Sequence, residues 1–240
     1  MADARYKRVV LKLSGEAMSG PGGGGIAPEA MASTVREIRP VLDMGVQVGV
    51  VVGAGNILRG RDLASNPHIR RVTADQMGMA ATLVNALALQ DALEAGGAPA
   101  NVFSAVPFGT ICHAFDRREA IARLEDGRAV VLAAGTGSPF FTTDTCAALR
   151  GLELGADIVL KATQVDGVYD SDPKNNPNAT RCDRLTYRQV IEKRLAVMDL
   201  TAISMCMDGG LPIVVFQLSR AGNLAAAVRG EPVGTLVSAE

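Results

Sequence analysis

Residues 130–144 read VVLAAGTGSPFFTTD and decide the fold of the chain. The stretch starts inside an apolar run, residues 129–134, of the kind that a buried parallel strand requires. The glycines and the proline of residues 135–139 end that strand and let backbone N–H groups approach a ligand. Thr142 and Thr143 can cap a following helix, whose free N–H groups then face the same opening. The stretch therefore predicts an anion site at the carboxyl end of a parallel strand.

Asp144 follows directly, and a carboxylate inside an anion site requires a bound cation or a neighbouring lysine. The same residues also fit a plain strand-to-helix turn whose threonines only cap the helix, so the other glycine turns must decide between the two interpretations.

Strand-like and helix-like segments alternate along the rest of the chain. Strands are predicted at residues 8–13, 46–52, 101–105, 157–162, 213–217 and 234–237. Helices are predicted at residues 28–43, 73–94, 116–125, 145–154, 186–193, 199–208 and 223–229. In the longest of these, the predicted apolar face comprises Met77, Ala80, Ala81, Val84, Leu87, Ala88 and Leu93. The pattern predicts an α/β fold, a three-layer αβα sandwich around a doubly wound, mostly parallel sheet, with residues 1–240 as a single domain.

Three polar residues beside these turns each allow two interpretations. Lys12 is either an edge lysine in water or a point charge at a phosphate site. Arg59 follows the turn GAGN at residues 53–56 and is either a surface residue or a phosphate contact. Asp75 lies in the predicted first turn of its helix, where it either complements the helix dipole or accepts hydrogen bonds from ribose hydroxyls. Leu58 excludes a dinucleotide fingerprint, because it stands where the third glycine belongs.

Composition excludes several classes of function. Lys and Arg number 24 against 25 Asp and Glu, which argues against a general nucleic-acid or membrane-surface binder. The 4 cysteines have no metal-binding or redox spacing, and His68 and His113 stand alone, so we expect reduced thiols and no protein metal site. Residues 1–15 show no signal-peptide pattern and no apolar run is long enough to span a bilayer, so we expect a cytoplasmic protein.

Together the three turns, at residues 12–15, 53–59 and 135–144, offer more anion-binding groups than one phosphate requires. They suit two phosphorylated ligands that meet head to head, as in phosphoryl transfer, which depends on positioning and on positive charge at the migrating group. Lys12 and Arg59 can supply that charge, with Mg²⁺ as a bridge. Tyr169, in the polar loop 163–172, offers a flat face to an adenine ring.

The segments VVLKLSGEA, QVGVVVGAGNILRG, ADQMGM, AGTGSPFFTTD, LKATQVDGVYDSDP and VMDL resemble the bacterial UMP kinase branch of the amino-acid kinase family, over nearly the whole chain. The resemblance implies a kinase without a Walker loop that converts ATP and UMP to ADP and UDP with Mg²⁺ in pyrimidine nucleotide synthesis. It also implies a cytoplasmic homohexamer.

By position, the resemblance assigns the site residues. It implies that the ATP phosphates are bound by Lys12, Leu13, Ser14, Gly15, Gly55 and Arg59, and that the adenosine is bound by Thr163, Gln164, Tyr169 and Asp172. It implies that UMP is bound by Ala54, Asp75, Thr136, Gly137, Ser138, Pro139, Phe140, Phe141, Thr142 and Thr143. Lys12, Arg59 and Asp144 are the catalytic residues, with Asp144 orienting Lys12 or the Mg²⁺, and Lys161 and Asp199 are supporting charges.

Members of the family are often activated by GTP and inhibited by UTP. Gln90 and Glu94 stand where basic residues on the long helix hold GTP, so we expect a weak GTP site or one that uses Arg117, Arg118, Arg123 or Arg128. Two other functions remain open: a relative that phosphorylates a carboxylate or carbamate, and a non-enzymatic nucleotide- or oxyanion-binding protein. The nucleoside-like acceptor region argues against the first, and the presence of both Lys12 and Asp144 argues against the second.

Overall fold

A computed structural model describes residues 4–58, 63, 67–171, 176 and 178–239 of the chain. Within them, nine strands form one sheet in the order β4-β3-β5-β2-β1-β6-β10-β11-β9, and β7 pairs with β8 separately. Neighbouring strands of the large sheet are parallel, except that β10 and β11 are antiparallel. The predicted mostly parallel α/β fold is therefore confirmed.

The strands are β1 (Arg8–Leu13), β2 (Gln47–Val52), β3 (Ala100–Ser104), β4 (His113–Ala114), β5 (Ala129–Ala133), β6 (Ile158–Thr163), β7 (Val168–Tyr169), β8 (Arg181–Cys182), β9 (Arg184–Thr186), β10 (Ile213–Gln217) and β11 (Thr235–Ser238). The helices are the 3₁₀ turn η1 (Gly15–Met18), α1 (Pro28–Asp43), α3 (Arg71–Ala95), α4 (Arg117–Glu125), α5 (Thr143–Leu154), α6 (Tyr187–Glu192), α7 (Leu200–Asp208) and α8 (Asn223–Val228).

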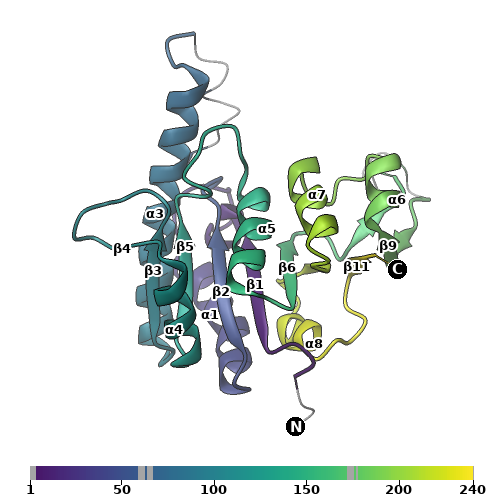
Figure 1. Cartoon of the computed structure of the whole chain (residues 1–240), viewed down its shortest axis with the longest axis horizontal. Coiled ribbons are helices and arrows are strands. Elements are labelled where there is room, and N and C mark those ends of the chain that lie inside the picture. Colours follow the sequence, from purple (N-terminus) through teal and green to yellow (C-terminus); the bar gives the residue numbers. More distant parts are fainter. Residues whose placement is uncertain (1–3, 59–62, 64–66, 172–175, 177, 240) are drawn as a thin grey trace.

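Helices cover both faces of the sheet (Figure 1). One apolar core joins α1, α3 and α8 to the sheet, and a second joins α4, α5, α6 and α7 to its other face. Alternation along each strand divides its side chains between the cores: Val9, Leu11 and Leu13 of β1 enter the first and Val10 enters the second. Because Lys12 follows the parity of Val10, it faces the layer that contains α5.

Most predicted elements lie where expected, and the bounds of α1 match the prediction at both ends. Five short elements were not predicted, namely η1, β4, β7, β8 and β9, because elements of two to four residues are too short to establish a hydrophobic period. Helix α5 starts at Thr143, two residues before the predicted start, so Thr142 alone is its N-cap and accepts from the N–H groups of Asp144 and Thr145.

The predicted apolar face of α3 is wrong in part. Ala81 and Leu93 are buried as expected, but Met77 is 37% exposed and Val84 is 50% exposed. The buried residues instead include Leu83, Ala86 and Leu89. This helix has apolar side chains around much of its circumference, so periodicity alone does not identify its inner face. The amino-terminal part of α3 also projects beyond the sheet (Figure 1).

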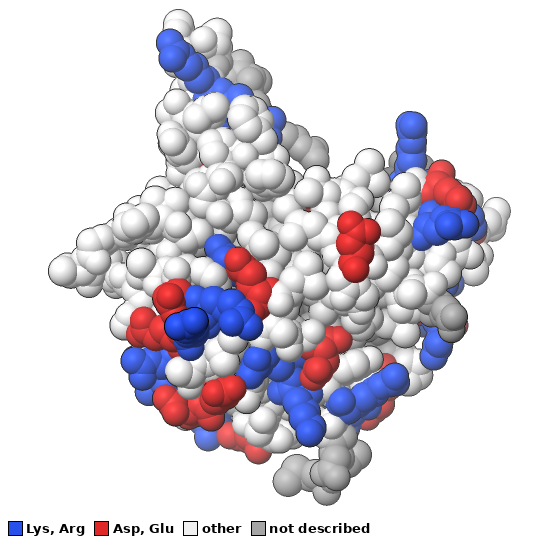
Figure 2. Space-filling model, in the orientation of Figure 1, with Lys and Arg blue, Asp and Glu red and all other residues white. Residues whose placement is uncertain are grey.

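In the part of the chain that the structure describes, no helix is both long enough and apolar enough to cross a bilayer. The cysteines Cys112, Cys146, Cys182 and Cys206 are all free thiols, as predicted. On the face shown in Figure 2, most charged side chains gather below, over α4 and the end of the molecule that carries the N-terminus, and the surface beside the α3 projection is mostly uncharged.

Candidate active site

Two lysines stand side by side at the carboxyl edge of the sheet. Lys12 of β1 is paired in register with Lys161 of β6, and strand alternation directs both toward the α5 layer, where Val10 and Val159 continue the same rows as apolar core residues. Lys12 is only 9% exposed. Two adjacent buried ammonium groups repel each other, so the site requires a negative charge between them.

Asp144, in the first turn of α5, supplies that charge. Its Oδ1 lies 2.9 Å from the Lys12 ammonium, and its Oδ2 accepts a 2.6 Å hydrogen bond from Lys161. Burial alone would raise the pKa of the Asp144 carboxyl, but the attraction of Lys12 and Lys161 outweighs it and holds that pKa below its usual value. Burial lowers the pKa of the Lys161 ammonium, although the Asp144 carboxylate opposes the shift.

One oxygen of this carboxylate keeps bonding capacity. Among the described residues, Asp144 Oδ1 is one of two buried side-chain polar atoms without a hydrogen bond. Its contact with Lys12 is therefore an ion pair that lacks hydrogen-bond geometry. An unsatisfied carboxylate oxygen of this kind is suited to a water molecule or to one coordination position of a hard cation such as Mg²⁺.

Asp199 fixes the start of α5 against α7. As N-cap of α7 it accepts from the Ala202 N–H at 3.0 Å, and it also accepts from the hydroxyls of Thr142 at 2.5 Å and Thr145 at 2.9 Å. The Val197 carbonyl accepts a second hydrogen bond from Lys161. The segment 197–199 thus holds both the helix that carries Asp144 and one of its lysine partners.

A cavity of about 270 Å³ opens beside this cluster. Its lining includes the predicted acceptor residues Ala54, Asp75, Thr136, Ser138, Phe141, Thr142 and Thr143, together with Gly55 and Thr82. Gly137, Pro139 and Phe140 belong to the same turn but do not line this cavity. Ala54 does not adopt a positive φ, so its backbone is in an ordinary conformation for a residue with a Cβ.

Asp75 ties the acceptor turn to α3. Its Oδ2 accepts from the Phe140 N–H at 2.9 Å, and its carboxylate also accepts from Arg71 Nε. The Arg71 guanidinium lies over the Phe140 ring, 5.7 Å from its centroid. The prediction that Asp75 lies in the first turn of the helix is wrong, because α3 starts at Arg71. The Asp75 carboxylate is therefore held by the Arg71 side chain and the Phe140 N–H, and not by the free N–H groups at the start of the helix.

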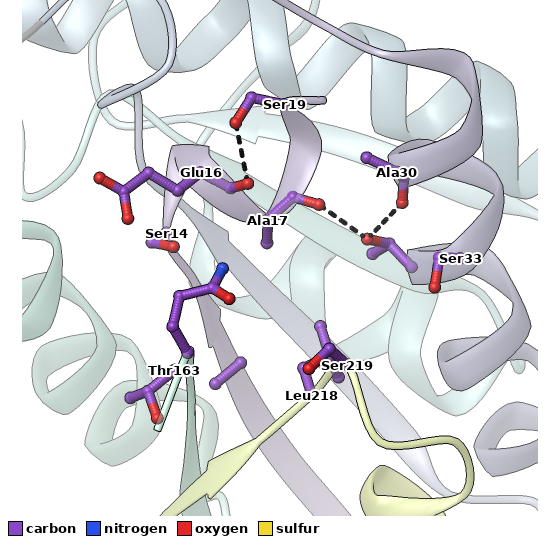
Figure 3. A pocket seen from close by; sticks show the side chains of 12 residues that line it. Ser14, Glu16, Ala17, Ser19, Ala30, Ser33, Thr163, Leu218 and Ser219 are labelled. Atoms are coloured by element: carbon purple, nitrogen blue, oxygen red, sulfur yellow. Dashed lines mark hydrogen bonds between the residues drawn. The ribbon is translucent and has the colours of Figure 1, made fainter. Parts of the chain in front are cut away.

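The residues predicted to hold adenosine are divided between two cavities. Thr163 and Gln164 line one of about 210 Å³, together with Ser14 and Ser219 (Figure 3). Tyr169 lines another of about 370 Å³, together with Asp170, Lys193 and Arg194. The Tyr169 hydroxyl donates to Asp166 at 2.8 Å, so its ring is fixed in place. Arg59 and Asp172 lie outside the described residues.

The first two glycine turns touch each other. The Gly53 N–H donates to the Leu13 carbonyl at 2.8 Å, and a Cβ at Gly15 would lie 2.5 Å from Gly55 N. No larger residue than glycine fits at position 15 without a shift of the second turn. The structure therefore brings residues 12–15, 53–56 and 135–144 to one edge of the sheet, as predicted.

Four residues that organise this edge were not predicted from the sequence: Arg71, Thr82, Asn85 and Thr145. Three of them, Thr82, Asn85 and Thr145, are buried polar residues. The sequence does show polar residues within otherwise apolar helices, and Thr82 and Asn85 are three residues apart on one such helix. That pattern does not identify the groups to which these side chains bond. Chemically, the edge offers backbone N–H groups and two ammonium charges to anions, beside a cavity large enough for a nucleotide fragment.

The chain is similar throughout to kinases. A sequence model described as the Amino acid kinase family matches residues 7–217. A uridylate kinase of Legionella pneumophila is 53% identical over 98% of this chain and 95% of its own length. One from Paramagnetospirillum magneticum is 51% identical over 99% of this chain and 98% of its own length. The crystal structure of a UMP kinase from Bacillus anthracis superposes with a TM-score of 0.95 at 36% identity, covering 98% of this chain and 97% of that one.

Proposed function

Because the chain belongs to the amino acid kinase family, we propose that it is a UMP kinase, which transfers the γ-phosphoryl group of ATP to UMP and gives ADP and UDP. The observation that carries the proposal is the Lys12–Asp144–Lys161 cluster beside the acceptor cavity, in a chain 53% identical to a uridylate kinase. In the cell the reaction is a step of pyrimidine nucleotide synthesis toward CTP, in the cytoplasm.

On the acceptor side, UMP occupies the 270 Å³ cavity. Its ribose hydroxyls donate to Asp75, and its phosphate lies against the backbone of Ala54 and residues 136–143. This assignment is supported by the mixed lining, since threonine hydroxyls suit a phosphate and Phe141 suits a base. Binding requires Asp75 to exchange part of its bonding with Arg71 and Phe140 N–H for bonds to the ribose.

On the donor side, residues 12–15, Gly55 and Arg59 hold the ATP phosphates, and Thr163, Gln164, Tyr169 and Asp172 hold the adenosine. The Tyr169 cavity, about 370 Å³, is the larger of the two that these residues line and is flanked by Lys193. That size, together with the fixed Tyr169 ring, supports placing the adenine there and leaving Thr163 near the phosphates.

The transfer needs positioning and charge more than proton chemistry. An oxygen of the UMP phosphate, already ionised at neutral pH, forms a bond to the γ-phosphorus while the bond from that phosphorus to the β–γ bridging oxygen breaks, and ADP leaves with the electron pair. Lys12 stabilises the negative charge on the migrating group. Asp144 holds Lys12 and Lys161 in place through one ion pair to each ammonium group.

Mg²⁺ fits this site, because Asp144 Oδ1 is a buried carboxylate oxygen without a hydrogen bond. When bound to the ATP phosphates, the ion supplies further positive charge and a template for the donor. No group of three or more metal-binding side chains exists among the residues described here. Most of the coordination shell must therefore come from phosphate oxygens and water.

The assembly is proposed to be a homohexamer. The supporting observation is that α3 leaves two apolar side chains exposed on one side, Met77 at 37% and Val84 at 50%. Exposed apolar residues on the same side of one helix suit a contact with another copy of the chain. UTP inhibits by occupying the acceptor cavity, and GTP activates weakly.

An assay of ADP release tests the proposed function. The enzyme is incubated with ATP and Mg²⁺ against UMP, CMP, dUMP, aspartate, acetylglutamate and carbamate in turn. We expect UMP to be the best acceptor by a wide margin. Turnover with an acidic amino acid or carbamate, and none with UMP, would overturn the proposal and favour a relative that phosphorylates carboxylates.

A further inference from the structure

Two polar side chains on the inner face of α3 are buried against the sheet. Thr82 is 4% exposed and Asn85 is 0% exposed, and their spacing of three residues places them on the same side of the helix. Nearby positions of this face are apolar core residues, including Ala86 and Leu89. Burying a hydroxyl and an amide here costs free energy unless each is hydrogen-bonded. The groups to which they bond therefore indicate the role of each side chain.

Asn85 bonds to the second glycine turn. Its Nδ2 donates to the Gly53 carbonyl at 2.7 Å and to Asn56 Oδ1 at 2.7 Å. Asn56 Nδ2 donates back to Asn85 Oδ1 at 3.1 Å. The two buried amides therefore form a reciprocal pair that fixes both ends of the turn 53–56 to one point on α3.

Asn56 extends this connection to two further segments. It donates to the Gly25 carbonyl at 2.7 Å, and its own carbonyl accepts from the Gly25 N–H at 2.9 Å. Its side-chain oxygen also lies so close to Gly15 that a Cβ there would collide with it. The position of Asn56, and through it Asn85, thus sets how closely the second turn approaches the first.

Thr82 bonds to the third turn. Its hydroxyl donates to the Met79 carbonyl at 2.7 Å and accepts from the Ala134 N–H at 2.7 Å. Ala134 follows β5 directly and has a φ of +60°, a conformation that is unfavourable for a residue with a Cβ. Strained residues of this kind persist only where their surroundings fix them. Thr82 supplies that fixation at the point where the acceptor turn leaves the sheet.

We infer that Thr82 and Asn85 are positioning residues for the phosphoryl transfer, acting on different turns through one rigid helix. Thr82 holds the acceptor turn at Ala134, and Asn85, with Asn56, holds the turn 53–56 that borders both nucleotides. The inference rests on the proposed function. It predicts that the two side chains affect nucleotide binding differently, whereas residues that serve only stability would affect it alike.

Steady-state kinetics with separately varied ATP and UMP test this inference. Wild-type turnover of UMP is measured first and tests the proposed function on its own. Thr82→Val keeps the shape of the side chain but leaves the Ala134 N–H without an acceptor. We expect it to raise the KM for UMP about tenfold and to leave the KM for ATP within about twofold, since one lost hydrogen bond to a buried group is worth roughly a factor of ten. Thr82→Ser retains the hydroxyl and restores the KM for UMP.

Asn85→Ala is expected to raise both KM values together, because the turn 53–56 borders both nucleotides. Asn56→Ala, which removes the partner amide, gives the same pattern and replaces Asn85→Ala if that variant does not fold. Asn101→Ala is the matched control: this asparagine also bonds through its side chain, to Arg128 at 2.6 Å, but it lies in β3 away from the turns. A smaller fraction of folded enzyme lowers the apparent kcat and leaves the KM values unchanged. That result in the Thr82 and Asn85 variants would overturn the inference. So would equal changes in both KM values for Thr82→Val.

Discussion

Lys12 and Lys161 occupy paired positions on the adjacent parallel strands β1 and β6, with one carboxylate between their ammonium groups. Each lysine lies on the side of its strand whose other residues pack against the helix layer that contains α5. The two charges are not equivalent. Lys161 donates hydrogen bonds both to Asp144 and to the Val197 carbonyl. Among the described residues, Lys12 has only its ion pair with Asp144, so Lys12 is the lysine that we propose contacts a phosphate.

Lys12→Ala is therefore expected to lower kcat by ~10²-fold or more, by analogy with the loss of one preorganised group that stabilises transition-state charge. Lys7→Ala is the matched control, since Lys7 is an exposed lysine just before the same strand. Initial rates at saturating ATP and UMP measure the effect. A near-normal kcat in Lys12→Ala would show that this lysine is structural only.

Lys161→Met is expected to move the acidic limb of the activity profile to higher pH. The positive charge of Lys161 helps to lower the pKa of the Asp144 carboxyl, so its removal raises that pKa. Asp144 then takes up a proton at a higher pH than in the wild type, and Lys12 loses its ion pair there. A profile of kcat against pH measures the shift. An acidic limb that stays in place would exclude Asp144 as the group that titrates.

The same pair makes a prediction about stability. The pKa of Asp144 in the folded chain lies below its usual value, so its ionised form stabilises the fold above the unfolded-state pKa of about 3.9, and this contribution is lost as the pH falls through the folded-state pKa. Denaturant titrations of wild type and Asp144→Asn between about pH 3 and pH 7 should show the difference in unfolding free energy shrinking toward low pH. A constant difference would contradict this.

Asp75→Asn is expected to weaken UMP far more than ATP. The carboxylate lines the acceptor cavity and also accepts a hydrogen bond from the Phe140 N–H, so an amide should weaken the proposed ribose contact and loosen the turn. Asp91→Asn, an exposed aspartate later in the same helix, is the control. Calorimetric titration with each nucleotide measures the two affinities. Loss of ATP affinity with intact UMP binding would mean that the two subsites are assigned the wrong way round.

Local patterns predicted the three turns and the helix α1 because those features depend on glycine, proline and periodicity within a few residues. The pairing of Lys12 with Lys161 did not follow from them. It depends on β1 lying next to β6, and strand order in a sheet with crossovers is not encoded in the order along the chain. The amide pair of Asn56 and Asn85 was missed for the same reason, since its partners are 29 residues apart. The exposed side of α3 was misassigned because that helix has apolar residues around much of its circumference.

The structure bears on the expected GTP regulation, because three of the four arginines that could contact GTP already have partners. Of the four arginines proposed as alternative contacts, Arg128 already donates to Asn101 at 2.6 Å and lies 3.9 Å from Glu94. Two others are engaged as well: Arg117 donates to the Glu153 carbonyl, and Arg123 lies 3.5 Å from Glu119. An effector triphosphate would have to displace these partners, which lowers its affinity.

We therefore expect little activation when GTP is titrated at fixed ATP and UMP, and a further loss in Arg128→Ala. Arg118→Ala tests the fourth arginine, which is exposed on α4. UTP inhibition should persist in both variants, because the site proposed for UTP is the acceptor cavity that Asp75 and residues 136–143 define. Strong activation at micromolar GTP, unchanged by either substitution, would show that the effector binds elsewhere and does not depend on these cations.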